Sequence, residues 1–248
     1  MATHTDIGGK SFGRKFSISR KNGQVDKDGR PYFFEWVKEV PNPANGREFE
    51  TRAKKDSSPA HYELFSALDG FLTGISLIDR DFGNGPEPVF CVFLSDGGED
   101  YTIEVGRPDH RYSMDFMKRI LDPNFNPAAK IRLSPYSLVD KQGKVNMGIS
   151  TFSGANKLLA SRKSDDRPNE PYNANLDGIP QATSREWKGK TEYDFSPVSD
   201  WLMERINSLV VPRLVKDPVS QPYAAALPIP KGPDQVTEKV PQIEDLPF

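Results

Sequence analysis

The sequence is poor in the residues that build disulfides and metal centres. One cysteine and three histidines occur among its 248 residues. A lone cysteine excludes an internal disulfide, and the place of Cys91 in the apolar run 89–93 predicts a buried thiol. The three histidines, His4, His61 and His110, with that single cysteine do not supply a zinc site. We therefore expect no metal centre and no bound cofactor.

Long hydrophobic runs and nucleotide-binding motifs are missing as well. No apolar run approaches the roughly 20 residues that cross a bilayer, and residues 1–6 lack the basic start of a secretion signal. These features predict a soluble cytoplasmic protein without a membrane partner. The phosphate loop G-x-x-x-x-G-K-[ST] is absent, which disfavours P-loop hydrolysis of nucleotides. A Mg²⁺-dependent nuclease that uses Asp79 and Asp81 is a weaker alternative, since two carboxylates beside a turn are usually solvated.

Charge is present in both signs but is unevenly distributed. The formal net charge is -2. Counted by segment, it is +5 over residues 1–55, -9 over 56–106, +7 over 107–163 and -5 over 164–248. Segregation of this kind favours a basic groove on a protein that is acidic overall. The alternative is a set of solvated faces on which charges cluster by chance.

The first fifty residues predict a flexible segment followed by a hairpin. Residues 1–30 are polar and basic, which is typical of a flexible arm. Residues 31–40 are aromatic and β-branched, which favours a strand. The turn at 41–46 contains Asn45-Gly46, a pair that readily takes positive φ angles. Residues 47–52 are then expected to return as the second strand of the hairpin.

The pattern over residues 61–153 predicts three strands, one helix and two strands. Apolar residues alternate in the second half of 61–82 and over 100–106, and residues 88–95 are a continuous apolar strand. Helical spacing over 112–121 ends at Pro123. Two alternating segments follow at 130–139 and 144–152. This is the order of a five-stranded oligonucleotide-binding (OB) barrel, in which the helix lies between strands 3 and 4. We expect a mainly β protein with this barrel, an N-terminal hairpin and a C-terminal amphipathic helix.

The C-terminal third predicts a loop, a helix and a tail. Residues 163–195 are rich in Asp, Asn, Pro and Gly and favour a long surface loop. Residues 196–210 have one apolar side, and Ser196 with Pro197 is a typical helix start. Residues 31–211 are thus expected to form one domain. Prolines interrupt residues 212–248, which predicts a disordered tail.

The last residues, Glu244-Asp245-Leu246-Pro247-Phe248, give the sequence its most specific feature. They resemble the tips of bacterial and bacteriophage single-stranded-DNA-binding proteins, which end in acids, an aliphatic residue, proline and phenylalanine. The resemblance covers this tip and, loosely, the order of elements over 61–153. It implies a cytoplasmic protein of DNA replication, recombination and repair whose tip recruits partner proteins. The added hairpin and the helix at 196–210 favour a divergent bacteriophage version.

Binding to single-stranded DNA requires cations for the phosphates and flat rings for the bases. Both kinds of residue are present, and about half of the rings are expected to be buried in a core. Tyr136 is the preferred exposed ring. The candidate phosphate contacts are Arg14, Lys15, Arg20, Lys21, Arg107, Arg111, Lys130, Arg132, Lys144 and Lys157. The candidate stacking rings are Tyr32, Phe34, Trp36, Phe49, Tyr101, Tyr136, Phe152 and Trp187, of which Trp36, Tyr136, Phe152 and Trp187 are preferred.

One competing function belongs to a different class. A barrel can be a scaffold alone, so a protein-interaction or virion component remains an alternative. Buried Trp36, Tyr136 and Trp187 with scattered cations would favour it. The sequence leaves the preference for DNA or RNA open, and a homodimer formed through the N-terminal hairpin is a further possibility.

Overall fold

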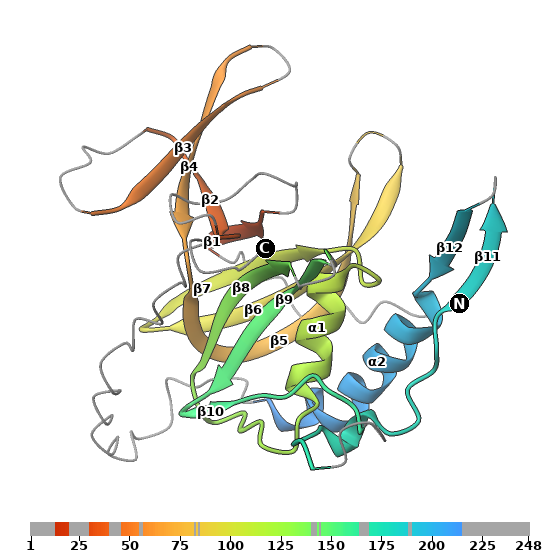
Figure 1. Cartoon of the computed structure of the whole chain (residues 1–248). Helices are drawn as coiled ribbons and strands as arrows, with labels where there is room; N and C mark the ends of the chain where they lie inside the picture. The colour runs from red at the N-terminus through yellow and green to blue at the C-terminus, as the bar shows by residue number, and fades with distance from the viewer. Residues whose placement is uncertain are drawn as a thin grey trace, which may run out of the picture.

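Most of the described chain forms one large mixed β-sheet (Figure 1). The computed structural model describes residues 13–19, 30–39, 46–54, 57–81, 83, 85–139, 143, 145–163, 169–187 and 190–214. Within these residues ten strands lie side by side in the order β10-β9-β8-β5-β6-β7-β1-β2-β4-β3. Neighbouring strands are antiparallel except β1 and β7, which run parallel. The expected mainly β architecture is therefore confirmed.

The central strands and the first helix follow the order that the sequence predicts. Helix α1 (Arg111–Ile120) lies between β7 and β8, as expected. It begins after His110, whose side chain accepts the Tyr112 N–H. The five strands of this region are β5 (Leu68–Asp81), β6 (Pro86–Asp96), β7 (Glu99–Gly106), β8 (Ile131–Val139) and β9 (Val145–Ser153). Two further strands flank them in sequence, β4 (Pro59–Phe65) and β10 (Asn156–Lys157).

The closed five-stranded barrel does not form among the described residues. Strands β5 to β9 pair in the order β9-β8-β5-β6-β7, and no ladder in this part of the chain joins β7 to β9. Both edges have other partners. β7 pairs with β1 (Arg14–Ile18), while α1 lies along β9, where Asp115 Oδ2 accepts the Ile149 N–H at 2.9 Å. Parts of the β7 and β9 edges are thus occupied by β1, by β10 and by the Asp115 side chain.

The N-terminal strands pair differently from the expected hairpin of residues 31–40 and 47–52. β2 (Phe33–Val37) and β3 (Glu48–Ala53) are not neighbours, because β4 lies between them and pairs with both. Aromatic cross-strand pairs favour this insertion: Trp36 of β2 lies opposite Tyr62 of β4. Each such pair contributes roughly 0.2–1 kcal/mol. We call the three strands β2, β4 and β3 the wing, which projects from the body in Figure 1.

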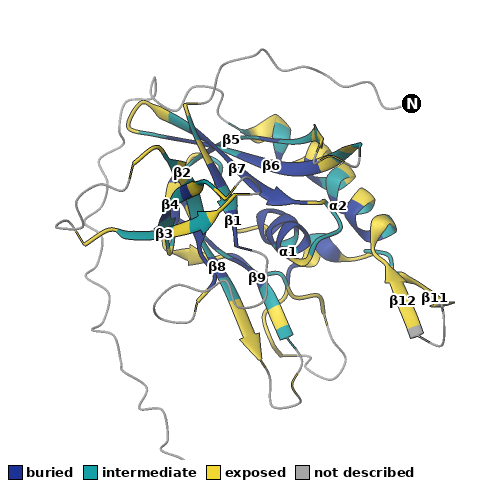
Figure 2. Ribbon diagram, turned by 90° about the horizontal axis from the view of Figure 1, so that it is seen from above, coloured by how far each residue is buried: buried dark blue, intermediate teal, exposed yellow. Residues whose placement is uncertain are grey.

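The core lies between the inner side of the sheet and the helices. Phe90, Ile103 and Ile149 of the sheet are fully buried, as are Phe116 and Met117 of α1. Complete burial of one such side chain contributes roughly 1.5–3 kcal/mol. Figure 2 shows the buried positions gathered around α1 and the strands behind it. On the side of the sheet that faces away from α1, residues near β10 and in the wing are partly exposed, whereas Thr102 and Glu104 in the middle are buried.

The amphipathic helix expected at residues 196–210 is present as α2 (Ser196–Leu209). Leu202 and Ile206 bury its apolar side in the same core. Ser196 is the first helical residue rather than the expected N-cap; the N-cap is Phe195, which makes no side-chain capping hydrogen bond. Asp194 Oδ1 accepts the Ser196 N–H at 2.9 Å.

The loop expected at residues 163–195 contains regular structure. It holds the short turn η2 (Ala174–Leu176) and a hairpin of β11 (Thr183–Trp187) and β12 (Lys190–Asp194). Figure 2 shows this hairpin projecting beyond α2 with exposed residues on both strands. The composition of residues 163–195 predicts a loop and therefore does not predict the pairing of β11 with β12. A last short turn, η3 (Val211–Arg213), follows α2.

Three further expectations concern burial, membranes and the chain ends. Cys91 is fully buried as expected, and burial raises the pKa of its thiol to about 12. None of the helices in the described ranges is long and apolar enough to cross a bilayer. Most of the basic arm and the tail from residue 215 onward, including the tip at 244–248, lie outside the described residues.

Candidate nucleic-acid interface

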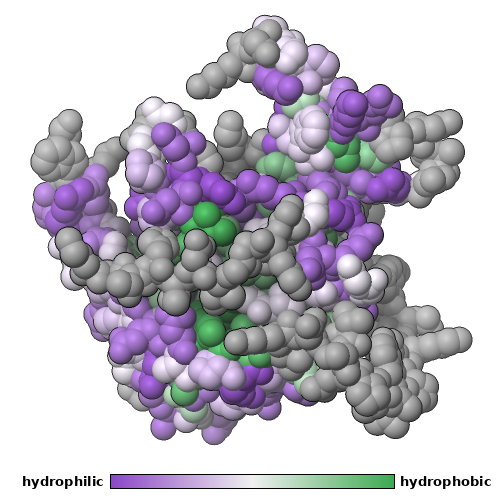
Figure 3. Space-filling model, turned by 180° about the vertical axis from the view of Figure 1, so that it is seen from behind, coloured by the Kyte–Doolittle hydropathy of each residue, from purple (hydrophilic) through white to green (hydrophobic). Residues whose placement is uncertain are grey.

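The side of the sheet opposite α1 is here called the outer side, and Thr102 in its middle is buried. Side chains alternate along each strand, so cross-strand register decides which residues share this side. In the space-filling view of Figure 3, hydrophilic surface surrounds a few apolar patches. In strand order from β10 to β4, members of the outer side are Lys157, Phe152, Arg132, Asp69, Phe71, Phe93, Thr102, Lys15, Ser17, Phe34 and Leu64.

Four of these residues form one line across four strands, which we call the basic row. Lys157 lies opposite Phe152, Phe152 opposite Arg132, and Arg132 opposite Asp69. Lys157 is exposed, Phe152 is half-buried, and the Arg132 side chain is 62% exposed. Arg132 Nε lies 3.7 Å from an oxygen of Asp69. The row places one ring between two cations, and all three residues are candidates from the sequence, although their arrangement in a row is not predicted by it.

Lys130 adds a second ring and cation beside the basic row. Its ammonium group lies 5.7 Å from the centroid of the Phe71 ring and 2.6 Å from Asp96 Oδ1. Both side chains of this ion pair are partly exposed. An exposed pair of this kind contributes only about 0–1 kcal/mol, so a phosphate can displace the carboxylate.

A buried carboxylate organises the middle of the outer side. Glu104 of β7 is 7% exposed, and its Oε1 lies 2.7 Å from Lys15 Nζ and 2.8 Å from Arg80 Nε. A buried charge needs close partners, and here it has two. The group of Lys15, Glu104 and Arg80 therefore carries a net positive charge with both cations partly exposed.

The wing carries a group of aromatic residues on the same outer side. Trp36 is 56% exposed, and it lies opposite the half-buried Tyr62. Phe34 packs edge-on against Tyr62 with their ring centroids 5.3 Å apart. The Arg52 guanidinium lies 4.6 Å from the centroids of both Phe34 and Tyr62. The predicted ring of Trp36 is thus exposed, but it lies several strands away from the basic row.

Arg14 is a predicted phosphate contact that the structure places elsewhere. It lies on the opposite parity of β1 from Lys15 and forms hydrogen bonds with Glu35 at 3.1 and 2.6 Å. These bonds to Glu35 raise the pKa of Arg14. The sequence could not predict this pair, because it depends on the β1–β2 register. Arg14 is a structural residue of the sheet.

Arg107 and Arg111 lie at the start of α1 and away from the basic row. Arg107 is exposed and forms an ion pair with Asp109 at 3.1 Å. Arg111 donates a hydrogen bond from Nη1 to the Val145 carbonyl at 2.8 Å. These two predicted contacts are therefore separate from Lys130, Arg132 and Lys157.

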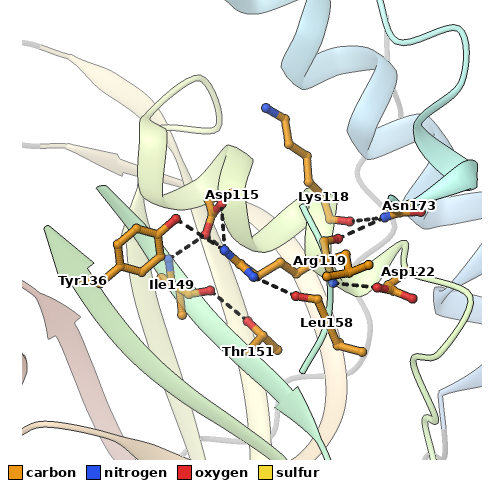
Figure 4. A network of polar contacts seen from close by, with 10 residues as sticks. Asp115, Lys118, Arg119, Asp122, Tyr136, Ile149, Thr151, Leu158 and Asn173 are labelled. Atoms are coloured by element: carbon orange, nitrogen blue, oxygen red, sulfur yellow. Dashed lines mark hydrogen bonds and ion pairs between the residues drawn. The ribbon is translucent and has the colours of Figure 1, made fainter. Parts of the chain in front are cut away.

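The expectation that Tyr136 is an exposed ring is wrong. Its ring is half-buried, and its hydroxyl accepts a hydrogen bond from Arg119 at 3.4 Å (Figure 4). Arg119 also binds Asp115 at 2.9 Å and the Leu158 carbonyl at 2.7 Å. Burial, with the charge of Asp115, raises the pKa of Tyr136. The residue belongs to the polar network that fixes α1 to β8 and β9.

The other predicted residues are either buried or undescribed. Tyr32 and Tyr101 are 1% and 8% exposed, so neither ring is open to a base, whereas Phe49 is half-buried. The side chain of Trp187 lies outside the described residues, although its backbone belongs to β11. The remaining predicted residues without a description are Arg20, Lys21, Lys144 and the tip residues Glu244, Asp245, Leu246, Pro247 and Phe248.

The carboxylates proposed for the nuclease alternative do not form a metal cluster. Asp79 and Asp81 are exposed at the end of β5, and Asp81 Oδ1 accepts the Gly83 N–H at 2.7 Å. Among the described residues, no three His, Cys, Asp or Glu side chains gather as metal ligands. The arrangement around Asp81 is that of an ordinary turn.

No family model, curated protein or solved structure matches the chain.

Sequence reasoning missed four residues of the outer side, among them Tyr62, which lies opposite Trp36. Phe71 lies beside Lys130, Arg80 binds Glu104, and Arg52 lies against the wing aromatics. Phe71 and Arg80 lie in the segment 56–106, whose net charge of -9 argues against a phosphate contact there. The alternation of β5 could have identified Phe71, because the neighbouring Leu72 is a core residue.

Proposed function

We propose that the chain binds single-stranded DNA on the outer side of its sheet, with the basic row as the main contact. The observation that supports this most directly is the line of Lys157, Phe152, Arg132 and Asp69 across four neighbouring strands. The Phe152 ring can stack on a base, and the exposed cations on its two sides, Lys157 and Arg132, can each bind a phosphate. Sequence-tolerant binding follows, because every base has a flat face.

The ion pairs of this region set the strength of binding. Arg132, Lys130 and Lys15 each lie within ion-pair distance of an acid. Phosphates must replace Asp69 and Asp96, whose pairs are exposed and therefore weak. Glu104 is buried and stays in place, with Lys15 and Arg80 directed to it. Moderate, strongly salt-dependent affinity is the expected consequence.

The order of β5 to β9 with α1 is that of an OB barrel opened at one seam, and we propose that the fold is a variant of it. The C-terminal tip then supplies the second half of the function. Glu244 and Asp245 with Leu246, Pro247 and Phe248 supply acids and an aromatic ring, which a partner can bind with a basic residue and an apolar pocket. We propose that this tip recruits replication or recombination proteins in the bacterial or host cytoplasm.

Substitution of the basic row tests the proposal. Arg132→Gln and Lys157→Gln should each weaken binding to a fluorescent oligo-dT by several-fold at low salt. Each should also lower the slope of log K against log salt by about 0.7, the value for one phosphate contact on a single strand. Fluorescence anisotropy at several salt concentrations measures both quantities.

Arg185→Gln is the matched control. Arg185 is 76% exposed and forms an ion pair with Glu192, but it lies on the β11–β12 hairpin away from the basic row. It should leave the affinity and the salt slope unchanged. Equal losses in all three variants, or no binding by the unmodified chain, would contradict the proposal.

A further inference from the structure

The wing holds a preformed group of flat side chains that the core does not require. Trp36, Phe34 and Tyr62 share the outer side of β2 and β4, whereas Phe33 on the opposite side is fully buried. The inner side of the wing has its own contacts, including an ion pair of Arg47 with the buried Glu63. Trp36 is more than half exposed and lies beside the partly exposed Phe34 and Tyr62, so the three rings form one group at the surface.

A fixed cation completes this group. Arg52 Nη2 donates hydrogen bonds to Glu50 Oε2 at 2.7 Å and to the Tyr32 hydroxyl at 3.0 Å. These contacts hold its guanidinium against the Phe34 and Tyr62 rings. Its Nε is buried and has no hydrogen-bond partner among the described residues. The cation and the rings are thus arranged before any ligand arrives.

We propose that Trp36, Tyr62, Phe34 and Arg52 form a second stacking site, which takes unpaired nucleobases of the same DNA strand that occupies the basic row. Two observations favour this ligand. Flat rings beside a guanidinium suit a base, which stacks on both. The cations Lys15 and Arg80 around Glu104 lie between the two sites on the same outer side, where they can follow the phosphates.

The distance between the sites makes the inference testable by oligonucleotide length. Arg132 lies on β8 and Trp36 on β2, five strands apart in the sheet order. At about 4.8 Å per strand, the path along the sheet is roughly 24 Å. A short oligonucleotide can occupy only one site, whereas a long one joins both and gains from the high effective concentration of the second contact. This inference rests on the proposed binding of single-stranded DNA.

Tryptophan fluorescence provides the decisive measurement. The chain has three tryptophans: Trp36, Trp187 and Trp201. A base stacked on Trp36 should quench its emission when oligo-dT of about 30 nucleotides binds, a length well above the site size of one domain. Trp36→Phe should remove most of that quenching. Trp201→Phe, which changes a half-buried ring of α2 covered by Arg205, should retain it.

Affinity measurements complete the test. Trp36→Ala should weaken binding of the long oligo-dT roughly tenfold, the loss expected for one stacked base. It should leave binding of an oligo-dT of about 4 nucleotides, the lower limit for one domain and too short to join the two sites, within about twofold. Trp36 is exposed, so circular dichroism should show both variants folded.

The outcomes separate this inference from the proposed function. If Arg132→Gln weakens binding while Trp36→Ala binds the long oligonucleotide normally and Trp36→Phe keeps the quenching, the second site is overturned and the proposed function stands. If the unmodified chain binds no single-stranded DNA, both are overturned. Loss of quenching in Trp36→Phe together with the length-dependent loss in Trp36→Ala establishes the site.

Discussion

At the scale of single residues, the outer side is shaped by how each charge is paired. Glu104 is buried and binds both Lys15 and Arg80, which leaves a net positive group. Arg14, one residue before Lys15, has the other parity and binds Glu35. The sequence treats Arg14 and Lys15 alike, as phosphate contacts. It does not predict that they point to opposite sides of the sheet and bind different acids, because this depends on strand register. Burial of Cys91 is a simpler case that the apolar run around it predicts correctly.

Cys91 should react slowly with a thiol reagent in the folded protein. Its side chain is fully buried, and burial raises the thiol pKa to about 12, so very little thiolate is present at neutral pH. Alkylation by a maleimide at pH 7, followed by mass spectrometry, should proceed only as fast as local opening and become rapid in urea. Fast, complete labelling under native conditions would contradict the described packing.

At the scale of elements, the seam between β7 and β9 distinguishes this sheet from a closed barrel. Alternation and helical spacing predict β6, β7, α1, β8 and β9, because each depends on local periodicity. Periodicity does not say which strand occupies an edge, so the pairing of β1 with β7 and of α1 with β9 is not predictable from it. The insertion of β4 between β2 and β3 is missed for the same reason.

Gly148 of β9 should be needed for the close packing of α1 against β9 at this seam. A Cβ atom at this position would clash with the Asp115 carboxylate and lie 2.6 Å from the Tyr136 hydroxyl. Gly148→Ala should therefore lower the free energy of unfolding by about 1–3 kcal/mol, as overpacking does. Urea denaturation measures the change.

Gly13→Ala is the control for this substitution. The nearest atom to a Cβ at residue 13 is the Asp100 carbonyl oxygen at 3.9 Å, an ordinary contact. The control should change the free energy of unfolding by less than about 0.5 kcal/mol. Equal stability of Gly148→Ala and the unmodified chain would contradict the close contact between Asp115 of α1 and β9.

At the scale of the whole molecule, the segments of opposite charge meet across the sheet. Lys15 comes from the basic segment 1–55, whereas Lys130 and Arg132 come from the basic segment 107–163. All three bind acids of the segment 56–106. The sequence predicts a basic groove from segment charges alone, but the fold pairs many of those charges. The paired cations are still partly exposed, and together with the neighbouring rings they form the surface that is proposed to bind DNA.

The most direct test of the central claim compares single-stranded and duplex DNA in one salt titration. Anisotropy of a labelled oligo-dT and of a duplex of equal length is followed with the unmodified chain as salt increases. The outer side as described predicts clearly tighter binding to the single strand, because the rings require unpaired bases. It also predicts affinity that falls linearly in log K against log salt. Equal affinity for both DNAs, or affinity independent of salt, would contradict the account.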